Sequence, residues 1–152
     1  MGTKREVESI EAQIGRTFEQ MIPFNRVLGL KIDSLDPRAP RLRFEMRPEL
    51  VGNPVRQILH GGVISATLDV VGGLAIALGL LVKKIEETPG RHFPNIGTID
   101  LRIDYLRPGR GKYFVATGRV VRLGGRVAVA HTELVNDTGE QIATGSAAYI
   151  VG

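Results

Sequence analysis

The feature that most constrains the fold is an apolar stretch of twenty residues, 63–82, whose only ionisable side chain is Asp69. Its length alone would allow it to cross a bilayer. A helix that is apolar all round can equally form the buried centre of a globular protein. A carboxylate in mid-membrane is costly, and strand patterns flank the stretch on both sides. We therefore predict a buried central helix and no membrane insertion.

Hydrophobic periodicity predicts the elements around this helix. Apolar residues at steps of three and four indicate an N-terminal helix that Pro23 ends; they are Val7, Ile10, Ile14, Phe18 and Met21. Polar–apolar alternation predicts strands at residues 29–36, 41–47, about ten residues from 95 onward, 112–123, 126–135 and 141–151. Residues 48–59 are predicted to be a loop. Because no βαβ alternation is present, we expect an α+β fold in which an antiparallel sheet wraps around the central helix.

Two details of this pattern can be tested against a structure. In the strand after residue 95, strict alternation predicts an apolar face made of Ile99, Leu101, Ile103 and Tyr105. The opposite, polar face is then made of Thr98, Asp100, Arg102 and Asp104. In the central helix, Gly72, Gly73 and Gly79 each cost roughly 1 kcal/mol relative to alanine. Another element should approach the helix closely enough to compensate.

Composition indicates one globular unit in a reducing compartment. The chain has 152 residues, of which 43% are hydrophobic and 24% are charged, and no cysteine. The charged N-terminus has no apolar core of a secretory signal, so we expect a cytoplasmic protein. A net charge of +4 favours anionic partners. Since no zinc-finger spacing or RNA-binding aromatic run is present, a nucleotide-bearing small molecule is expected, and not nucleic acid.

The residues most suggestive of chemistry are the His60-Gly61-Gly62 turn and Asp69. Backbone N–H groups in the first turn of a helix lack intrahelical partners and can stabilise an oxyanion. An entry turn without a ligand, with His60 satisfied by local hydrogen bonds, would explain the turn equally well. A carboxylate inside an apolar helix, however, is costly unless it is paired, metal-bound or functional. We therefore predict a function for Asp69.

Gly61 and Asp69 cannot serve one carbonyl within one chain. They are eight residues apart, which is about 12 Å along a helix axis. In a two-fold dimer with antiparallel central helices, Asp69 of one chain could lie beside the first turn of the other. The spacing therefore predicts a homodimer with two shared sites. A tetramer built from two such dimers is the alternative assembly.

Several segments resemble the PaaI-like hotdog acyl-CoA thioesterases, and among them a bacterial medium- and long-chain branch. The resemblance spans nearly the whole chain, through PFNRVLGL, VGN, ILHGGVISATLDVVGGL, GTIDLRIDYLRPGRG, RVAVAHTELVND and IATGSAAYIVG. It implies a hotdog domain over residues 26–152, preceded by an N-terminal helix and lead-in at 1–25. It also implies hydrolysis of acyl-CoA. Since the sequence has no metal-ligand pair, phosphate loop or nucleophile elbow, we expect no metal or redox cofactor.

The resemblance further implies roles for individual residues. Asp69 activates water or attacks the thioester, the N–H of Gly61 polarises the carbonyl, and Thr98 helps to position water. His60, Gly62 and an upstream amide shape the site. Asn53 matches that amide, although it lies seven residues before His60 and not six as in many relatives, so Gln57 is the alternative. The basic residues predicted to meet CoA phosphates are Arg107, Arg110, Lys112, Arg122 and Arg126.

Two other functions compete with hydrolysis. A hotdog hydratase or dehydratase would use a histidine with a carboxylate, but within different helix motifs. A non-catalytic acyl-CoA sensor would need an output domain, and about 25 residues before the first strand are too few for one. Release of free thiol, hydration of an enoyl thioester, or binding without turnover distinguishes the three.

Overall fold

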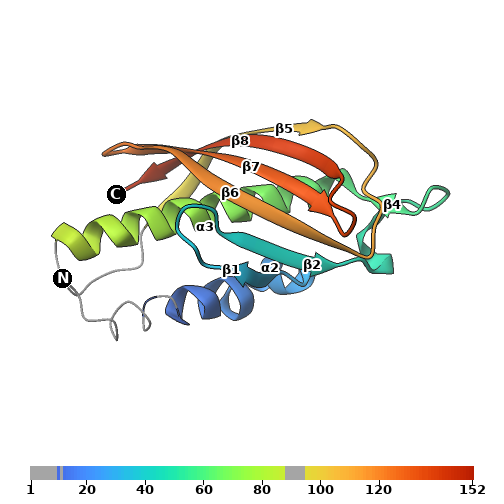
Figure 1. Cartoon of the computed structure of the whole chain (residues 1–152), viewed down its shortest axis with the longest axis horizontal. Helices are drawn as coiled ribbons and strands as arrows, with labels where there is room; N and C mark the ends of the chain where they lie inside the picture. Colours follow the sequence, from blue (N-terminus) through green and yellow to red (C-terminus); the bar gives the residue numbers. More distant parts are fainter. Residues whose placement is uncertain (1–9, 11, 88–94) are drawn as a thin grey trace.

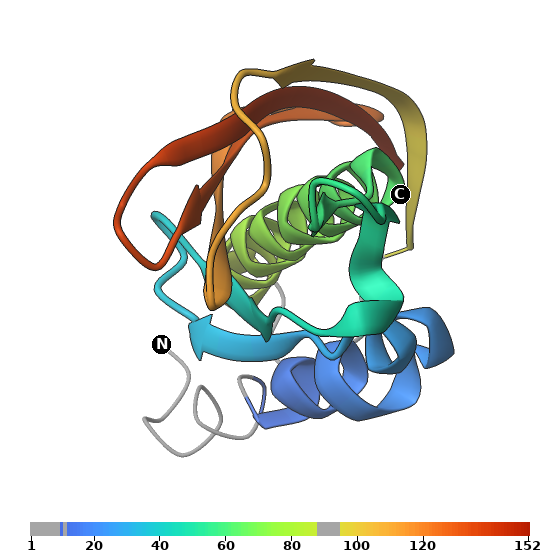
Figure 2. The same ribbon diagram turned by 90° about the vertical axis from the view of Figure 1, so that its right-hand side faces the viewer.

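The computed structural model describes residues 10, 12–87 and 95–152 (Figure 1). A six-stranded antiparallel sheet, in the order β1-β2-β6-β7-β8-β5, curves around the long helix α3. The helix lies between this sheet and the N-terminal helices (Figure 2). The predicted α+β hotdog architecture is therefore confirmed.

The elements follow the predicted order. The helical segments are η1 (Thr17–Met21), α2 (Pro23–Leu28), η2 (Pro48–Leu50) and α3 (Gly61–Glu87). The strands are β1 (Lys31–Ser34), β2 (Arg41–Glu45), β3 (Val51–Asn53), β4 (Ile58–Leu59), β5 (Ile96–Tyr105), β6 (Tyr113–Leu123), β7 (Val127–Asn136) and β8 (Gln141–Val151). The last three strands agree with the sequence prediction to within one residue, because each alternates cleanly and is bounded by turn residues.

Helix α3 forms the centre of the core. Leu68, Val71, Leu74 and Ile76 are fully buried. The segment Gly61–Lys83 is long and apolar enough to cross a membrane, but 61% of its most apolar window is buried inside the protein. The sheet approaches closely at Gly118 of β6, where a Cβ would lie 2.5 Å from the Val71 carbonyl oxygen. This burial favours a core helix over a membrane span.

The N-terminal region contains more helix than predicted. Helical residues 12–16 continue into the π-helical turn η1, which ends at Met21, before Pro23 as expected. Pro23, however, then begins a second helix, α2. The predicted strand at 29–36 is correspondingly shorter. Val7 lies outside the described residues. The division proposed between residues 25 and 26 falls inside α2, and Ile14, Phe18 and Leu28 belong to the same core cluster as α3.

The predicted loop at 48–59 contains structure that periodicity could not reveal. A 3-10 turn, η2, leads into the two-stranded hairpin of β3 and β4. These strands have three and two residues, which is too short for an alternating pattern to be recognised. The hairpin delivers the chain to His60 at the start of α3.

Gly72→Ala is expected to lower the free energy of unfolding by about 1–3 kcal/mol. The added Cβ would overlap the Tyr149 hydroxyl. That hydroxyl donates a 2.7 Å hydrogen bond to the Asp69 carbonyl, which a displacement would break. Urea unfolding measures the effect.

Gly73→Ala is the matched control for this change. Its Cβ would come no closer than 3.7 Å to Tyr149. Because alanine favours the helix, we expect no loss of stability, or a gain of up to about 1 kcal/mol. Equal unfolding free energies for the two variants would contradict the prediction.

Candidate active site

The first turn of α3 leaves one backbone donor without a partner. The Nδ1 atom of His60 accepts the Gly62 N–H at 2.7 Å, and the His60 carbonyl accepts from Val63 and Ile64. Among the residues that the structure describes, the Gly61 N–H has no partner. His60 thus acts as the side-chain cap of α3, and Gly61 is the donor available to a ligand.

Tyr105 at the end of β5 stands against this turn. Its hydroxyl donates a 3.2 Å hydrogen bond to the Gly61 carbonyl, and a Cβ on Gly61 would lie 3.4 Å from its ring. Its side chain therefore faces α3, as the alternation predicts. Its contact with Gly61, however, could not be inferred from sequence spacing, because 44 residues separate the two.

Asp69 is held by Thr98 of β5. The Thr98 hydroxyl donates a 2.8 Å hydrogen bond to Oδ1 of Asp69. The carboxylate is half-buried, so it is neither fully desolvated nor freely solvated. The structure therefore brings the two residues together, and the role of Thr98 in positioning water stays a prediction.

The pairing of β5 with β8 corrects the predicted strand faces. Thr98 pairs with Tyr149 and Asp100 with Ala148, so Ile99 is the extra residue of a β-bulge. Ile99 is 55% exposed, whereas Thr98 faces α3. Strict alternation assigned Ile99 to the apolar face and Thr98 to the opposite one, and both assignments are wrong because the bulge reverses the alternation.

Tyr149 supports Asp69 from the sheet, and sequence reasoning missed it. It is 1% exposed, and its hydroxyl donates to the Asp69 backbone carbonyl. Burial raises the pKa of this hydroxyl, and the neighbouring Asp69 charge raises it further. Tyr149 therefore stays a neutral donor. The available signal was a large aromatic residue directly after the small residues of GSAA, in a chain whose central helix carries two adjacent glycines.

A pocket of about 240 Å³ opens beside Asp69. Asp69 and Thr98 contribute charge and polarity to its wall. The other lining residues are Phe18, Ile22, Asn25, Val70, Gly73, Ile96 and Tyr149. The site thus combines a fixed carboxylate with a mainly apolar hollow, which suits a substrate with an apolar tail.

Comparison with known proteins identifies the family. The sequence profile of the thioesterase superfamily matches residues 56–143, which include His60, Gly61, Asp69 and Thr98. The chain is 42% identical to the medium/long-chain acyl-CoA thioesterase YigI of Escherichia coli strain K12 over 142 residues, 91% of this chain and 92% of that protein. This chain belongs to the thioesterase superfamily. The predicted resemblance and the predicted enzyme class, a thioester hydrolase, are thereby confirmed.

A solved structure supports the same assignment to the thioesterase superfamily. A protein from Shewanella oneidensis, described as related to this superfamily, is 40% identical and superposes with a TM-score of 0.85. The match covers 99% of this chain and 100% of that one. The fold and the sequence therefore point to one family.

Asn53 and Gln57, the two candidates for the amide that precedes His60, both stabilise a turn. Asn53 Oδ1 accepts from the N–H groups of Val55 and Arg56 at 3.1 and 3.0 Å. Gln57 has a φ of +53° and donates from Nε2 to the Pro54 carbonyl at 2.7 Å. Neither side chain is hydrogen-bonded to His60 or Gly61 in the described structure. Their contribution to the site therefore stays a prediction.

The five basic residues do not form one cluster within a chain. Arg107 donates to the Gln141 carbonyl and Arg110 to the Arg56 carbonyl, both at 2.8 Å. Lys112, two residues after Arg110, is exposed. Arg122 and Arg126 flank the turn at the far end of β6, and Arg126 lines a separate pocket with Ile150. The length of β6 separates the groups by roughly 33 Å. Within one chain the five residues therefore lie in two separate groups, and their contact with CoA phosphates stays a prediction.

No three histidine, aspartate or glutamate side chains in the part of the chain that the structure describes come together as potential metal ligands. The candidate reactive groups of the site are Asp69, Thr98 and the Gly61 N–H.

Proposed function

We propose that this chain hydrolyses medium- or long-chain acyl-CoA to the free acid and CoA. The observation that carries the proposal is the Asp69 carboxylate, held at 2.8 Å by Thr98 beside a mainly apolar pocket. The activity named for the 42% identical Escherichia coli protein supports the substrate class. The cytoplasm is the proposed compartment, because a chain without cysteine needs no oxidising environment.

Asp69 can hydrolyse the thioester to the free fatty acid by either of two routes. As a general base it takes a proton from water while the hydroxide adds to the thioester carbonyl carbon. The oxyanion is stabilised by the Gly61 N–H, the C–S bond breaks, and the thiolate takes the proton from Asp69. As a nucleophile, Asp69 itself attacks, expels the thiolate and forms an anhydride. Water then hydrolyses the anhydride, which frees the acid, restores the Asp69 carboxylate and supplies the proton that the thiolate takes. Both routes need the ionised carboxylate and one oxyanion donor.

A dimer would bring these two groups together. Strand β5 forms an edge of the sheet and pairs only with β8 in the described structure, so its other side offers unpaired backbone groups. A two-fold axis near Leu101 and Arg102 would set Thr98 opposite Tyr105 of the partner subunit. Thr98 contacts Asp69 and Tyr105 contacts Gly61, so this register directs Asp69 towards the partner's Gly61. A dimer of dimers remains compatible with this pairing.

The same two-fold axis offers a role for the two separated basic groups. Antiparallel pairing of β5 would place the Arg126 end of one chain on the same side as the Arg107 end of its partner, because Arg126 lies beside Val151 at the start of β5. One CoA would then meet basic residues from both chains. His60 and Gly62 would shape the approach to the carbonyl, and no metal or cofactor is needed for either route.

Hydrolysis is tested with a panel of saturated acyl-CoAs of increasing chain length. We expect release of free CoA thiol, detected with a thiol reagent, with kcat/KM rising from short to medium and long chains. Enoyl-CoA is the matched control substrate, because hydration removes its double bond without releasing thiol. Enoyl hydration without thiol release, or saturable binding without turnover, would replace the thioesterase assignment by one of the two alternatives.

A further inference from the structure

The adjacent glycines of α3 have different surroundings. Gly72 leaves room for the Tyr149 hydroxyl, which a Cβ would overlap. Gly73 has no such packing reason: its Cβ would meet only the Tyr149 ring, at an ordinary 3.7 Å. A helix-interior glycine costs about 1 kcal/mol relative to alanine. The absent side chain at 73 therefore calls for another explanation.

Gly73 lies on the pocket wall, one helical turn beyond Asp69. Residues four apart share a helix face, so a substrate whose carbonyl is at Asp69 can run directly over Gly73. On the facing strand, Thr98 contacts Asp69, and Ile96 lines the pocket two residues before it. The wall thus changes from polar at the carboxylate to apolar beyond it.

The N-terminal segment closes this apolar part with a fixed geometry. In the π-helical turn the Ile22 N–H donates to Thr17 O at 3.1 Å, one residue further back than in an α-helix. The buried Asn25 side chain donates to the Phe18 carbonyl at 3.0 Å. Phe18 and Ile22 are both pocket-lining residues. They form a wall opposite α3 that is anchored by hydrogen bonds.

We propose that Gly73 determines acyl-chain specificity: its missing side chain keeps open the channel through which the tail passes from Asp69 towards Phe18 and Ile22. This inference rests on the proposed thioesterase function. A side chain at 73 would occupy the volume that the tail needs, beyond the carbons nearest the carbonyl. It would therefore penalise long substrates more than short ones.

The test compares kcat/KM for dodecanoyl-CoA and propanoyl-CoA in wild type, Gly73→Ala and Gly73→Leu. Each methylene denied burial costs about 0.8 kcal/mol, or roughly fourfold. We expect the dodecanoyl-to-propanoyl ratio to fall about fourfold with alanine and, for four displaced carbons, on the order of two-hundred-fold with leucine. Gly15→Leu is the control: it adds the same side chain to a helical glycine outside the pocket lining, where a Cβ meets nothing within 4 Å. Its ratio should equal that of wild type.

An unchanged ratio in both Gly73 variants would overturn the proposal, whether their absolute rates fall or not. If the leucine variant fails to fold by circular dichroism, the alanine variant decides, because its Cβ meets no steric conflict. Failure of the proposed function looks different: wild type then releases thiol from neither substrate.

Discussion

Asp69→Asn is expected to lower the turnover of acyl-CoA about a hundredfold or more and to leave a folded protein. Asparagine is nearly isosteric, and its amide oxygen can still accept from Thr98. The Tyr149 bond is also retained, because it uses the Asp69 backbone carbonyl. The amide, however, can neither take a proton from water nor attack a thioester. Steady-state thiol release measures the loss, and circular dichroism with size-exclusion chromatography checks the fold and assembly.

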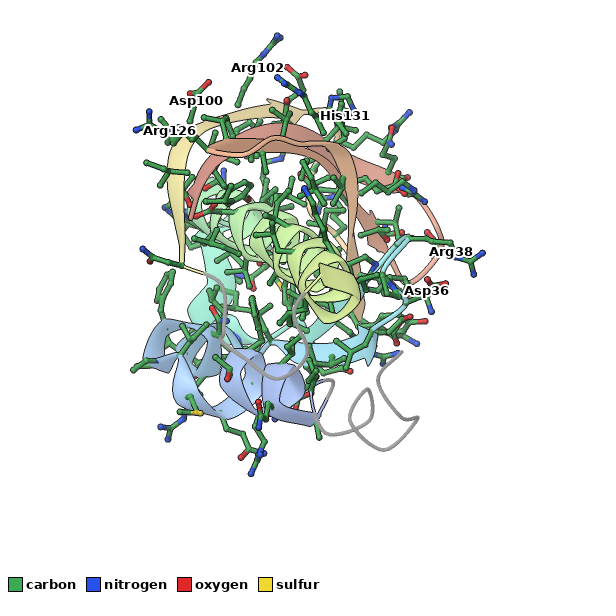
Figure 3. All side chains as sticks on the ribbon, turned by 90° about the vertical axis from the view of Figure 1, so that its left-hand side faces the viewer. Asp36, Arg38, Asp100, Arg102, Arg126 and His131 are labelled. Carbon is green, nitrogen blue, oxygen red and sulfur yellow. The ribbon has the colours of Figure 1, made fainter. Side chains whose placement is uncertain are left out.

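Asp100→Asn is the matched control for this experiment. Asp100 is an exposed carboxylate on the same β5 region as Thr98, and it projects outwards from the sheet, away from α3 (Figure 3). Its substitution removes the same charge and should leave turnover near that of wild type. Near-normal turnover of Asp69→Asn would remove Asp69 from the mechanism.

Mixing two inactive chains, Asp69→Asn and Gly61→Pro, is expected to restore roughly a quarter of wild-type activity if sites are shared between two-fold partners. Proline removes the Gly61 N–H. In a mixed dimer one site combines both lesions, whereas the other takes intact Gly61 from one chain and intact Asp69 from its partner. Random pairing makes about half of all dimers mixed, and half of their sites are intact. Thiol release after co-expression or joint refolding gives the recovered fraction.

The control for the mixing experiment is the fold of the proline chain. Proline is tolerated in the first turn of helices, and the Gly61 N–H has no partner in the described structure, so no internal bond is lost. The residue before a proline is restricted, however, and His60 must keep its cap on Gly62. The chain must therefore be shown to fold and dimerise alone. Given that, mixtures as inactive as their parents would mean that Gly61 and Asp69 do not meet across an interface.

Local physics explains what could be predicted from the sequence. The central helix follows from an apolar stretch with one charge, and β6, β7 and β8 follow from alternation bounded by glycine and asparagine turns. The candidate groups could also be named, because every helix start offers N–H groups without intrahelical partners and a carboxylate in an apolar helix is costly wherever the chain folds. Each of these signals lies within a few residues of sequence.

Tertiary structure decided the features that depend on which segments meet. The β5–β8 register places the bulge at Ile99 and thereby turns Thr98 towards Asp69, which alternation alone predicts wrongly. The contact with Tyr149 explains why residue 72 is a glycine but not why residue 73 is one, although the sequence alone does not distinguish these adjacent glycines. The chain by itself therefore determined the helix, most strands and the reactive groups, since these depend on local pattern. The orientation of those groups and the hollow beside them required the structure, because they depend on contacts between residues far apart in the chain.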